Sequence, residues 1–173
     1  MTGTLFIAAC LVLGVLAPAA VAQVQNFAPV TQQMLLNPSP NDWLMFSRTY
    51  DAQRFSPLNQ INRQNVSQLR MVWTRGIAAG TQETIPIVYR GVLYTIAPGA
   101  GVLALDATNG DLIWEYQRKL PDDARNFIGA PTAARAKTLA IFEDMVYYTA
   151  PDGYVVALDA RTGAVRWETA AHD

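Results

Sequence analysis

The carboxylate of Glu83 and two basic side chains near position 136 are the groups whose spacing points to binding chemistry. Glu83 stands directly before an apolar run at residues 84–88. The sequence repeats with an offset of 53 residues, and that offset carries Glu83 to position 136, which Arg135 and Lys137 flank. Hydrogen bonds with an ionised partner are strong. A carboxylate and a cation at equivalent points of two repeats therefore predict a site for a polar, charged ligand.

Composition and charge exclude several other functions. The 173 residues contain 13 Lys or Arg and 14 Asp or Glu, so the net charge of −1 predicts no nucleic-acid surface. Hydrophobic residues make up 51% of the chain, which favours a folded domain over a disordered one. Cys10 is the only cysteine and His172 the only histidine. Beyond residue 22 this excludes disulfides, thiolate nucleophiles, catalytic triads based on histidine, and zinc sites built from several Cys or His residues.

Residues 1–22 are predicted to be a signal peptide. Residues 5–16 are almost wholly apolar but too few to span a bilayer, and Ala20-Val21-Ala22 forms a cleavage site. No Lys or Arg precedes this apolar core. Residues 7–10, IAAC, also resemble a lipoprotein box, so lipid attachment at Cys10 is the alternative. We expect export to the periplasm, without a stable membrane span.

An internal repeat organises the rest of the chain. Residues 94–115 read YTIAPGAGVLALDATNGDLIWE, and residues 147–168 read YYTAPDGYVVALDARTGAVRWE. Eleven of these 22 aligned positions are identical without a gap. Each copy and the apolar run before it contain four short segments rich in strand-forming residues, separated by turns with Pro, Asp and Gly. Four antiparallel strands in each repeat are typical of a β-propeller blade.

These repeats predict an all-β fold with blades at about residues 84–116 and 138–169, joined by a loop over 117–132. Propellers usually need at least four blades to close, so we expect the first, truncated part of a larger domain. Residues 69–73, LRMVW, resemble an outermost strand without its three partners. Such a strand would close the ring with strands from the far C-terminus. The chain therefore divides into residues 1–22, an N-terminal segment at 23–75 with the closing strand, and two blades at 76–173.

Two motifs resemble a known family. Residues 157–167 fit the tryptophan-docking pattern A-x-D-x-x-T-G-x-x-x-W, and residues 104–114 fit it with Asn109 in place of Thr. This pattern is similar to that of the eight-bladed propeller of pyrroloquinoline quinone (PQQ) enzymes. Its Trp is a flat wedge that can fill the gap between blades. Residues 41–62, NDWLMFSRTYDAQRFSPLNQIN, resemble the N-terminus of the methanol/ethanol dehydrogenase quinoproteins. The likeness covers about residues 41–169.

The resemblance implies roles for the residues named first. In residues 82–86, QETIP, Glu83 matches a family Glu that hydrogen-bonds PQQ. Lys137 stands where the family carries a PQQ-binding Arg, and Arg135 supplies a guanidinium if the loop shifts by one or two residues. Many members also have adjacent cysteines over PQQ. Residues 128–131 occupy that region here and contain none.

The resemblance also implies the activity of the whole protein. It predicts a fragment of a periplasmic PQQ-dependent alcohol dehydrogenase, which oxidises an alcohol to an aldehyde and passes electrons to a cytochrome c or a quinone. The family's calcium or lanthanide ligands and its catalytic carboxylate base lie in later blades, so we assign no catalytic or metal-binding residue and expect the fragment alone to be inactive. Glu143, Asp144 and Asp152 are expected to be solvated turn residues. The alternative is a non-catalytic propeller that serves as a protein-binding scaffold at the cell envelope.

Overall fold

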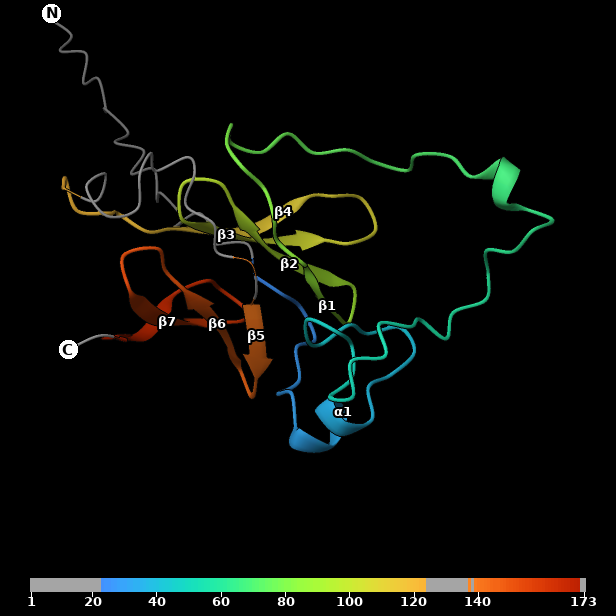
Figure 1. The fold of residues 1–173 in the computed structure, drawn as a ribbon, viewed down its shortest axis with the longest axis horizontal. Helices are drawn as coiled ribbons and strands as arrows, with labels where there is room; N and C mark the ends of the chain where they lie inside the picture. The colour runs from blue at the N-terminus through green and yellow to red at the C-terminus, as the bar shows by residue number, and fades with distance from the viewer. Residues whose placement is uncertain (1–22, 124–136, 138, 172–173) are drawn as a thin grey trace, which may run out of the picture.

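The computed structural model describes residues 23–123, 137 and 139–171, which form two four-stranded antiparallel sheets (Figure 1). The first sheet contains β1 (Ile87–Tyr89), β2 (Val92–Ala97), β3 (Gly101–Asp106) and β4 (Leu112–Gln117), in that order. The second contains β5 (Leu139–Phe142), β6 (Met145–Thr149), β7 (Tyr154–Asp159) and β8 (Val165–Ala170). The predicted all-β fold and its two meander blades are confirmed. The first strand starts later than expected, at Ile87 instead of residue 84.

The two sheets are built alike down to single hydrogen bonds. β3 and β7 each have a register irregularity at the equivalent position of the repeat, which is Ala104/Leu105 in β3 and Ala157/Leu158 in β7. In the turn that follows, Gly110 N–H donates to the Asp106 carbonyl and Gly163 N–H donates to the Asp159 carbonyl, both at 2.8 Å. The repeat in the sequence is therefore a repeat of backbone geometry.

Tryptophan side chains join each turn to the element before it. The Trp114 ring packs on Gly163, and its Nε1–H donates to the Ala160 carbonyl at 3.0 Å. The Trp73 ring packs in the same way on Gly110 of the first sheet, and its Nε1–H donates to the Ala107 carbonyl at 3.1 Å. The predicted wedge between blades is thus confirmed for Trp114, which is only 4% exposed.

A carboxylate stabilises the turn that receives Trp114. Asp159 Oδ1 accepts hydrogen bonds from the backbone N–H groups of Arg161 at 2.9 Å and Thr162 at 3.2 Å. Burial acts to raise the pKa of Asp159, but the side-chain and backbone hydrogen bonds from Arg161 outweigh it, so the pKa lies below its usual value. The carboxylate stays ionised and holds the turn in the shape that the tryptophan needs.

The N-terminal segment contacts both sheets. Val24 N–H donates to the Arg161 carbonyl, Val30 forms an antiparallel bridge with Glu143, and Trp43 forms another with Val88. This segment contains α1 (Gln32–Leu36) and, further along, the short 3-10 helix η1 (Val66–Gln68). Val24, Val30 and Leu44 belong to one apolar cluster with the facing sides of the two sheets. The N-terminal segment and the two sheets therefore share a core.

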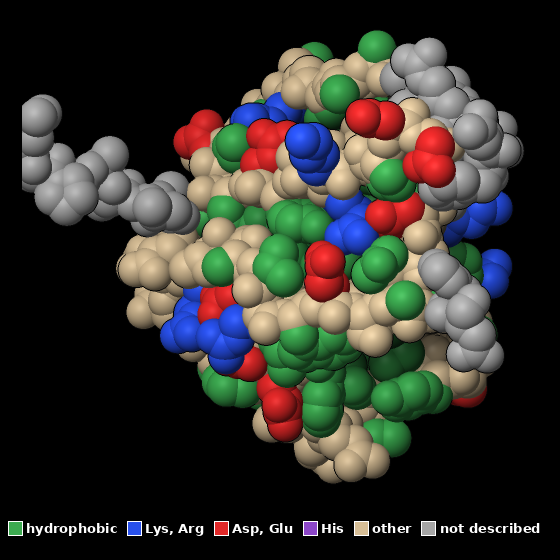
Figure 2. Space-filling view, turned by 90° about the vertical axis from the view of Figure 1, so that its left-hand side faces the viewer, with side chains coloured by type: hydrophobic (Ala, Val, Ile, Leu, Met, Phe, Trp, Pro, Cys, Tyr) green, Lys and Arg blue, Asp and Glu red, His purple; other side chains and the backbone are tan. Residues whose placement is uncertain are grey.

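Residues 53–78 extend away from the two sheets and return where Trp73 docks (Figure 1). Leu69–Trp73 is not a strand in this structure, and Met71 and Val72 are exposed. Its closure of a ring with later strands stays a prediction. The outermost strand β8 is also exposed along its whole length, and Trp167 packs on Tyr147 with the ring centroids 5.9 Å apart. The face in Figure 2 carries groups of exposed hydrophobic side chains between charged ones.

A buried ion pair also connects the sheets. Arg118, directly after β4, donates from Nε to both carboxylate oxygens of Asp152, at 2.8 and 2.9 Å, and from a terminal nitrogen to Glu168 at 2.9 Å. Its guanidinium lies 4.6 Å from the centroid of the Tyr154 ring. The side chain of Asp152 is 6% exposed, so the expectation of a solvated Asp152 was wrong. The carboxylate of Asp152, in the turn between β6 and β7, can be buried because Arg118 from the preceding sheet compensates its charge.

Replacement of Gly163 by Ala tests the tryptophan docking. A Cβ atom at Gly163 would lie 2.6 Å from the Trp114 ring, at a φ of +74°. Gly91 has a φ of +78° but open space around such an atom, so Gly91→Ala is a control for backbone strain alone. We expect Gly91→Ala to lower the free energy of unfolding by about 1 kcal/mol and Gly163→Ala by about 3 kcal/mol in urea titrations. Equal losses would contradict a packing role for Trp114.

Replacement of Asp152 by Asn tests the buried ion pair. The change keeps the shape of the side chain but leaves the buried Arg118 guanidinium without its main counter-charge. We expect a loss of about 3 kcal/mol of unfolding free energy, measured by urea titration. Glu168 contacts the same Arg118 but has a side chain that is 45% exposed, so Glu168→Gln should cost below about 1 kcal/mol. The reverse order of the two losses would show that Asp152 is not the essential partner.

Candidate functional site

Glu83 and Lys137, predicted from the repeat, lie together in the folded chain. Lys137 Nζ is 3.4 Å from Glu83 Oε2, and the two side chains are 64% and 36% exposed. One residue precedes β1 of the first sheet and the other precedes β5 of the second. The pair is therefore a solvent-accessible carboxylate and ammonium at the entrances of two neighbouring blades.

Backbone and side-chain hydrogen bonds hold this pair in position. Ile85 N–H donates to the Lys137 carbonyl at 3.1 Å, which joins the approaches to β1 and β5. The Gln82 side-chain amide donates to the Ile96 carbonyl at 2.6 Å and so ties the residue before Glu83 to the end of β2. Pro86 has no N–H to give to a sheet, which agrees with the late start of β1 at Ile87. This role of Gln82 was not predicted from the sequence, because its hydrogen-bond partner is a backbone atom 14 residues away.

Two other sequence-based expectations cannot be compared with the structure. Arg135 and the region 128–131, where many members of the resembling family have adjacent cysteines, lie outside the described residues. Within the described ranges, no group of three or more His, Cys, Asp or Glu side chains is arranged to hold a metal ion. No described helix is long and apolar enough to cross a membrane. The site residues that can be placed are thus Glu83 and Lys137.

The arrangement can bind a ligand with mixed polarity. A carboxylate accepts hydrogen bonds, and an ammonium group donates up to three and has a positive charge. A ligand that carries a carboxylate beside a hydrogen-bond donor can therefore contact both side chains at once. Both groups are exposed, so such a ligand can reach them. Their contact with each other is a surface ion pair of small net stability, which a ligand can replace at little cost.

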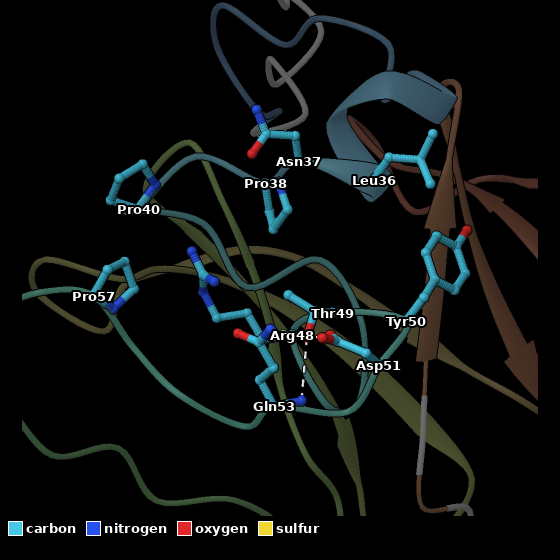
Figure 3. Close-up of a pocket in the computed structure, with 10 residues that line it drawn as sticks. All are labelled: Leu36, Asn37, Pro38, Pro40, Arg48, Thr49, Tyr50, Asp51, Gln53 and Pro57. Atoms are coloured by element: carbon cyan, nitrogen blue, oxygen red, sulfur yellow. Dashed lines mark hydrogen bonds between the residues drawn. The ribbon is translucent and has the colours of Figure 1, made fainter.

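A cavity of about 590 Å³ lies elsewhere, on the N-terminal segment (Figure 3). We call it the Arg48 cavity. The segment that carries it meets the first sheet at the turn between β1 and β2, where Asp42 accepts a hydrogen bond from Arg90 N–H at 2.9 Å. Glu83 lies before the opposite end of β1. The cavity is lined by Leu36, Asn37, Pro38, Pro40, Arg48, Thr49, Tyr50, Asp51, Gln53 and Pro57.

Comparisons with known proteins agree on one family. Residues 43–166 match the family model PQQ, described as glucose/ethanol/alcohol dehydrogenase, β-propeller domain. The dehydrogenase subunit of a quinone-dependent alcohol dehydrogenase from Gluconobacter oxydans is 35% identical over 161 residues, which are 92% of this chain and 21% of that protein. The quinohemoprotein alcohol dehydrogenase ADH-IIG from Pseudomonas putida is 37% identical over 157 residues, with 87% and 21% covered.

Solved structures give the same result. The structure of ADHIIG from Pseudomonas putida HK5 has a TM-score of 0.74 and 36% identity, over 84% of this chain and 22% of that one. A europium-containing methanol dehydrogenase has a TM-score of 0.69 and 32% identity, over 80% and 24%. The chain thus spans about a fifth of the length of these relatives. From the matched model and these similarities, the chain belongs to the glucose/ethanol/alcohol dehydrogenase β-propeller family.

Proposed function

We propose that this chain is the N-terminal part of a periplasmic PQQ-dependent alcohol dehydrogenase that oxidises an alcohol to an aldehyde. The observation that carries the proposal is the contact between Glu83 and Lys137, which joins the entrances of two blades with a carboxylate and a cation 3.4 Å apart. Relatives at about 35% identity are named as quinone-dependent and quinohemoprotein alcohol dehydrogenases, which supports this activity for the whole protein. They do not favour the alternative of a non-catalytic scaffold.

The two side chains fit the cofactor. PQQ supplies the redox chemistry when it is bound, and it is an anionic tricarboxylate. Lys137 can donate hydrogen bonds to a cofactor carboxylate, and Glu83 can accept one from a donor on the cofactor ring system. Because Ile85 N–H bonds the Lys137 carbonyl, the backbone positions from which the two side chains extend are held together before the ligand arrives. A lysine in place of a planar guanidinium keeps the charge but gives up the two parallel hydrogen bonds that Arg can form.

The remaining parts of the function belong to the rest of the polypeptide. We infer that a calcium or lanthanide ion, the catalytic base and the substrate contacts are provided beyond Asp173. A europium-containing methanol dehydrogenase among the structural neighbours is consistent with a lanthanide as one choice. The electron acceptor is proposed to be a cytochrome c or a quinone, as the names of the quinohemoprotein and quinone-linked relatives suggest. Residues 1–22 are proposed to direct export to the periplasm.

Reconstitution of the full-length parent tests this function. The purified parent is incubated with PQQ and either calcium or a lanthanide, and the visible absorption of bound PQQ and the oxidation of primary alcohols with an artificial electron acceptor are measured. We expect cofactor absorption that survives gel filtration, together with alcohol-dependent turnover. A parent that stays colourless and inactive with both metals would overturn the proposal.

Glu83→Gln and Lys137→Met in that parent test the two site residues. Each change removes a charged hydrogen-bonding group from the cofactor, so we expect the Kd for PQQ to rise about tenfold or more, measured by equilibrium titration. Asp111→Asn, a change of a surface carboxylate in the turn between β3 and β4, is the matched control and should leave the Kd unchanged. Unchanged affinity in Glu83→Gln, with intact folding, would remove Glu83 from the site.

A further inference from the structure

The Arg48 cavity contains a buried arginine that has no counter-charge among the described residues. Arg48 is only 8% exposed, its Nε atom has no hydrogen-bond partner, and no carboxylate of the described residues lies within ion-pair distance of it. Its backbone φ of +68° is unusual for a residue other than glycine. A buried charge is normally paired, because its removal from water is otherwise very costly. Arg48 is therefore a largely buried cation for which the described residues provide no partner.

The carboxylate in the same cavity does not serve as that partner. Asp51 Oδ2 accepts a hydrogen bond from the Gln53 side-chain amide at 2.6 Å. Hydrogen bonds from Thr49 and Gln53 hold the pKa of Asp51 below its usual value, so Asp51 is ionised and already engaged. Figure 3 shows the Arg48 side chain extending away from Asp51, toward Pro40 and Pro57. The guanidinium thus faces the part of the cavity walled by prolines.

Apolar side chains around the cavity indicate what kind of occupant it receives. Leu36 and Tyr50 line the cavity and are both more than half exposed, and Phe55 and Leu58 on the same segment are exposed as well. Arginine and aromatic residues are enriched in the cores of protein interfaces. An unpaired guanidinium among exposed aromatic and aliphatic side chains therefore indicates contact with another folded segment, whose acidic group completes the charge pair.

We propose that the Arg48 cavity receives an Asp or Glu side chain from a later part of the same polypeptide, and so fixes the N-terminal segment to the rest of the propeller. This inference rests on the proposed function, in which the chain is part of a longer dehydrogenase. The relatives are almost five times as long as the segment matched here, so most of the polypeptide is available to supply the carboxylate. The cavity does not include Glu83 or Lys137, so this contact is separate from the cofactor site.

The test compares the change in Tm that one substitution causes in two proteins, and we expect a fall in only one of them. Arg48→Met removes the charge but keeps much of the side-chain volume. In the chain of residues 1–173 it removes an unpaired buried charge, so we expect Tm to stay the same or rise. In the full-length parent it leaves the acidic partner buried and unpaired, so we expect Tm to fall by about 2–4 °C or more. Both values are measured by differential scanning calorimetry.

Arg54→Met is the matched control. Arg54 also has a positive φ, of +52°, but its guanidinium lies over the Phe46 ring on an exposed surface. We expect it to change Tm by less than about 1 °C in both proteins. If Arg48→Met prevents the parent from folding, Arg48→Lys, which keeps the charge, must restore folding. Failure of that rescue would overturn the proposal, because shape and not charge would then be essential.

Other occupants give different results. An increase in the Tm of the 1–173 chain on addition of acetate or citrate, abolished by Arg48→Met, would overturn the proposal in favour of a small free anion. Self-association of the 1–173 chain that Arg48→Met abolishes, seen by sedimentation, would overturn it in favour of a second copy. A fall of Tm in both proteins would place the partner of Arg48 within residues 1–173. The PQQ titrations are read separately. A parent that binds no PQQ, but whose Tm alone falls on Arg48→Met, would therefore contradict only the proposed function.

Discussion

The contact between a tryptophan ring and the glycine turn of the next repeat is the constraint on which this fold depends. Gly163 brings the turn so close to Trp114 that a single added methyl group would overlap the ring. The indole N–H also donates a hydrogen bond to the Ala160 carbonyl, so packing fixes the position of the indole ring and the hydrogen bond fixes its orientation. A sheet whose outer strand is held in this way is restricted in its distance and orientation relative to its neighbour. The repeat therefore specifies the arrangement of the sheets as well as the sheets themselves.

The candidate site follows from that arrangement. Glu83 and Lys137 are far apart in the sequence, and each is placed only by the start of its own sheet. Because the sheets are fixed to each other, the backbone of Ile85 meets the backbone of Lys137, and the two charged side chains come within 3.4 Å. The site is thus an outcome of blade packing.

The sequence predicted what depends on local pattern. The strands and the turns with Gly110 and Gly163 follow from strand-forming runs and the repeat. The offset of 53 residues pointed to Lys137 as a counterpart of Glu83, but the contact between the two side chains was not predicted. The sequence did not predict the burial of Asp152, because the compensating Arg118 belongs to the other sheet and its approach to Asp152 is a tertiary event. It also did not predict the buried charge of Arg48, whose positive φ has no signature in residue type. Long-range partners and strained backbone are therefore what remained beyond prediction.

The exposed strand β8 gives the assembly a direction. Each repeat has one indole ring packed on its turn and carries another on its outermost strand. In the second repeat the indole of the outermost strand belongs to Trp167, which is 42% exposed. The two faces of such a unit differ, so the contact between a tryptophan and a turn is heterologous and joins units head to tail. The angle between successive units then decides whether the series forms a closed ring or continues as a spiral. The geometry of the contact between tryptophan and turn therefore also determines how many sheets a closed propeller contains.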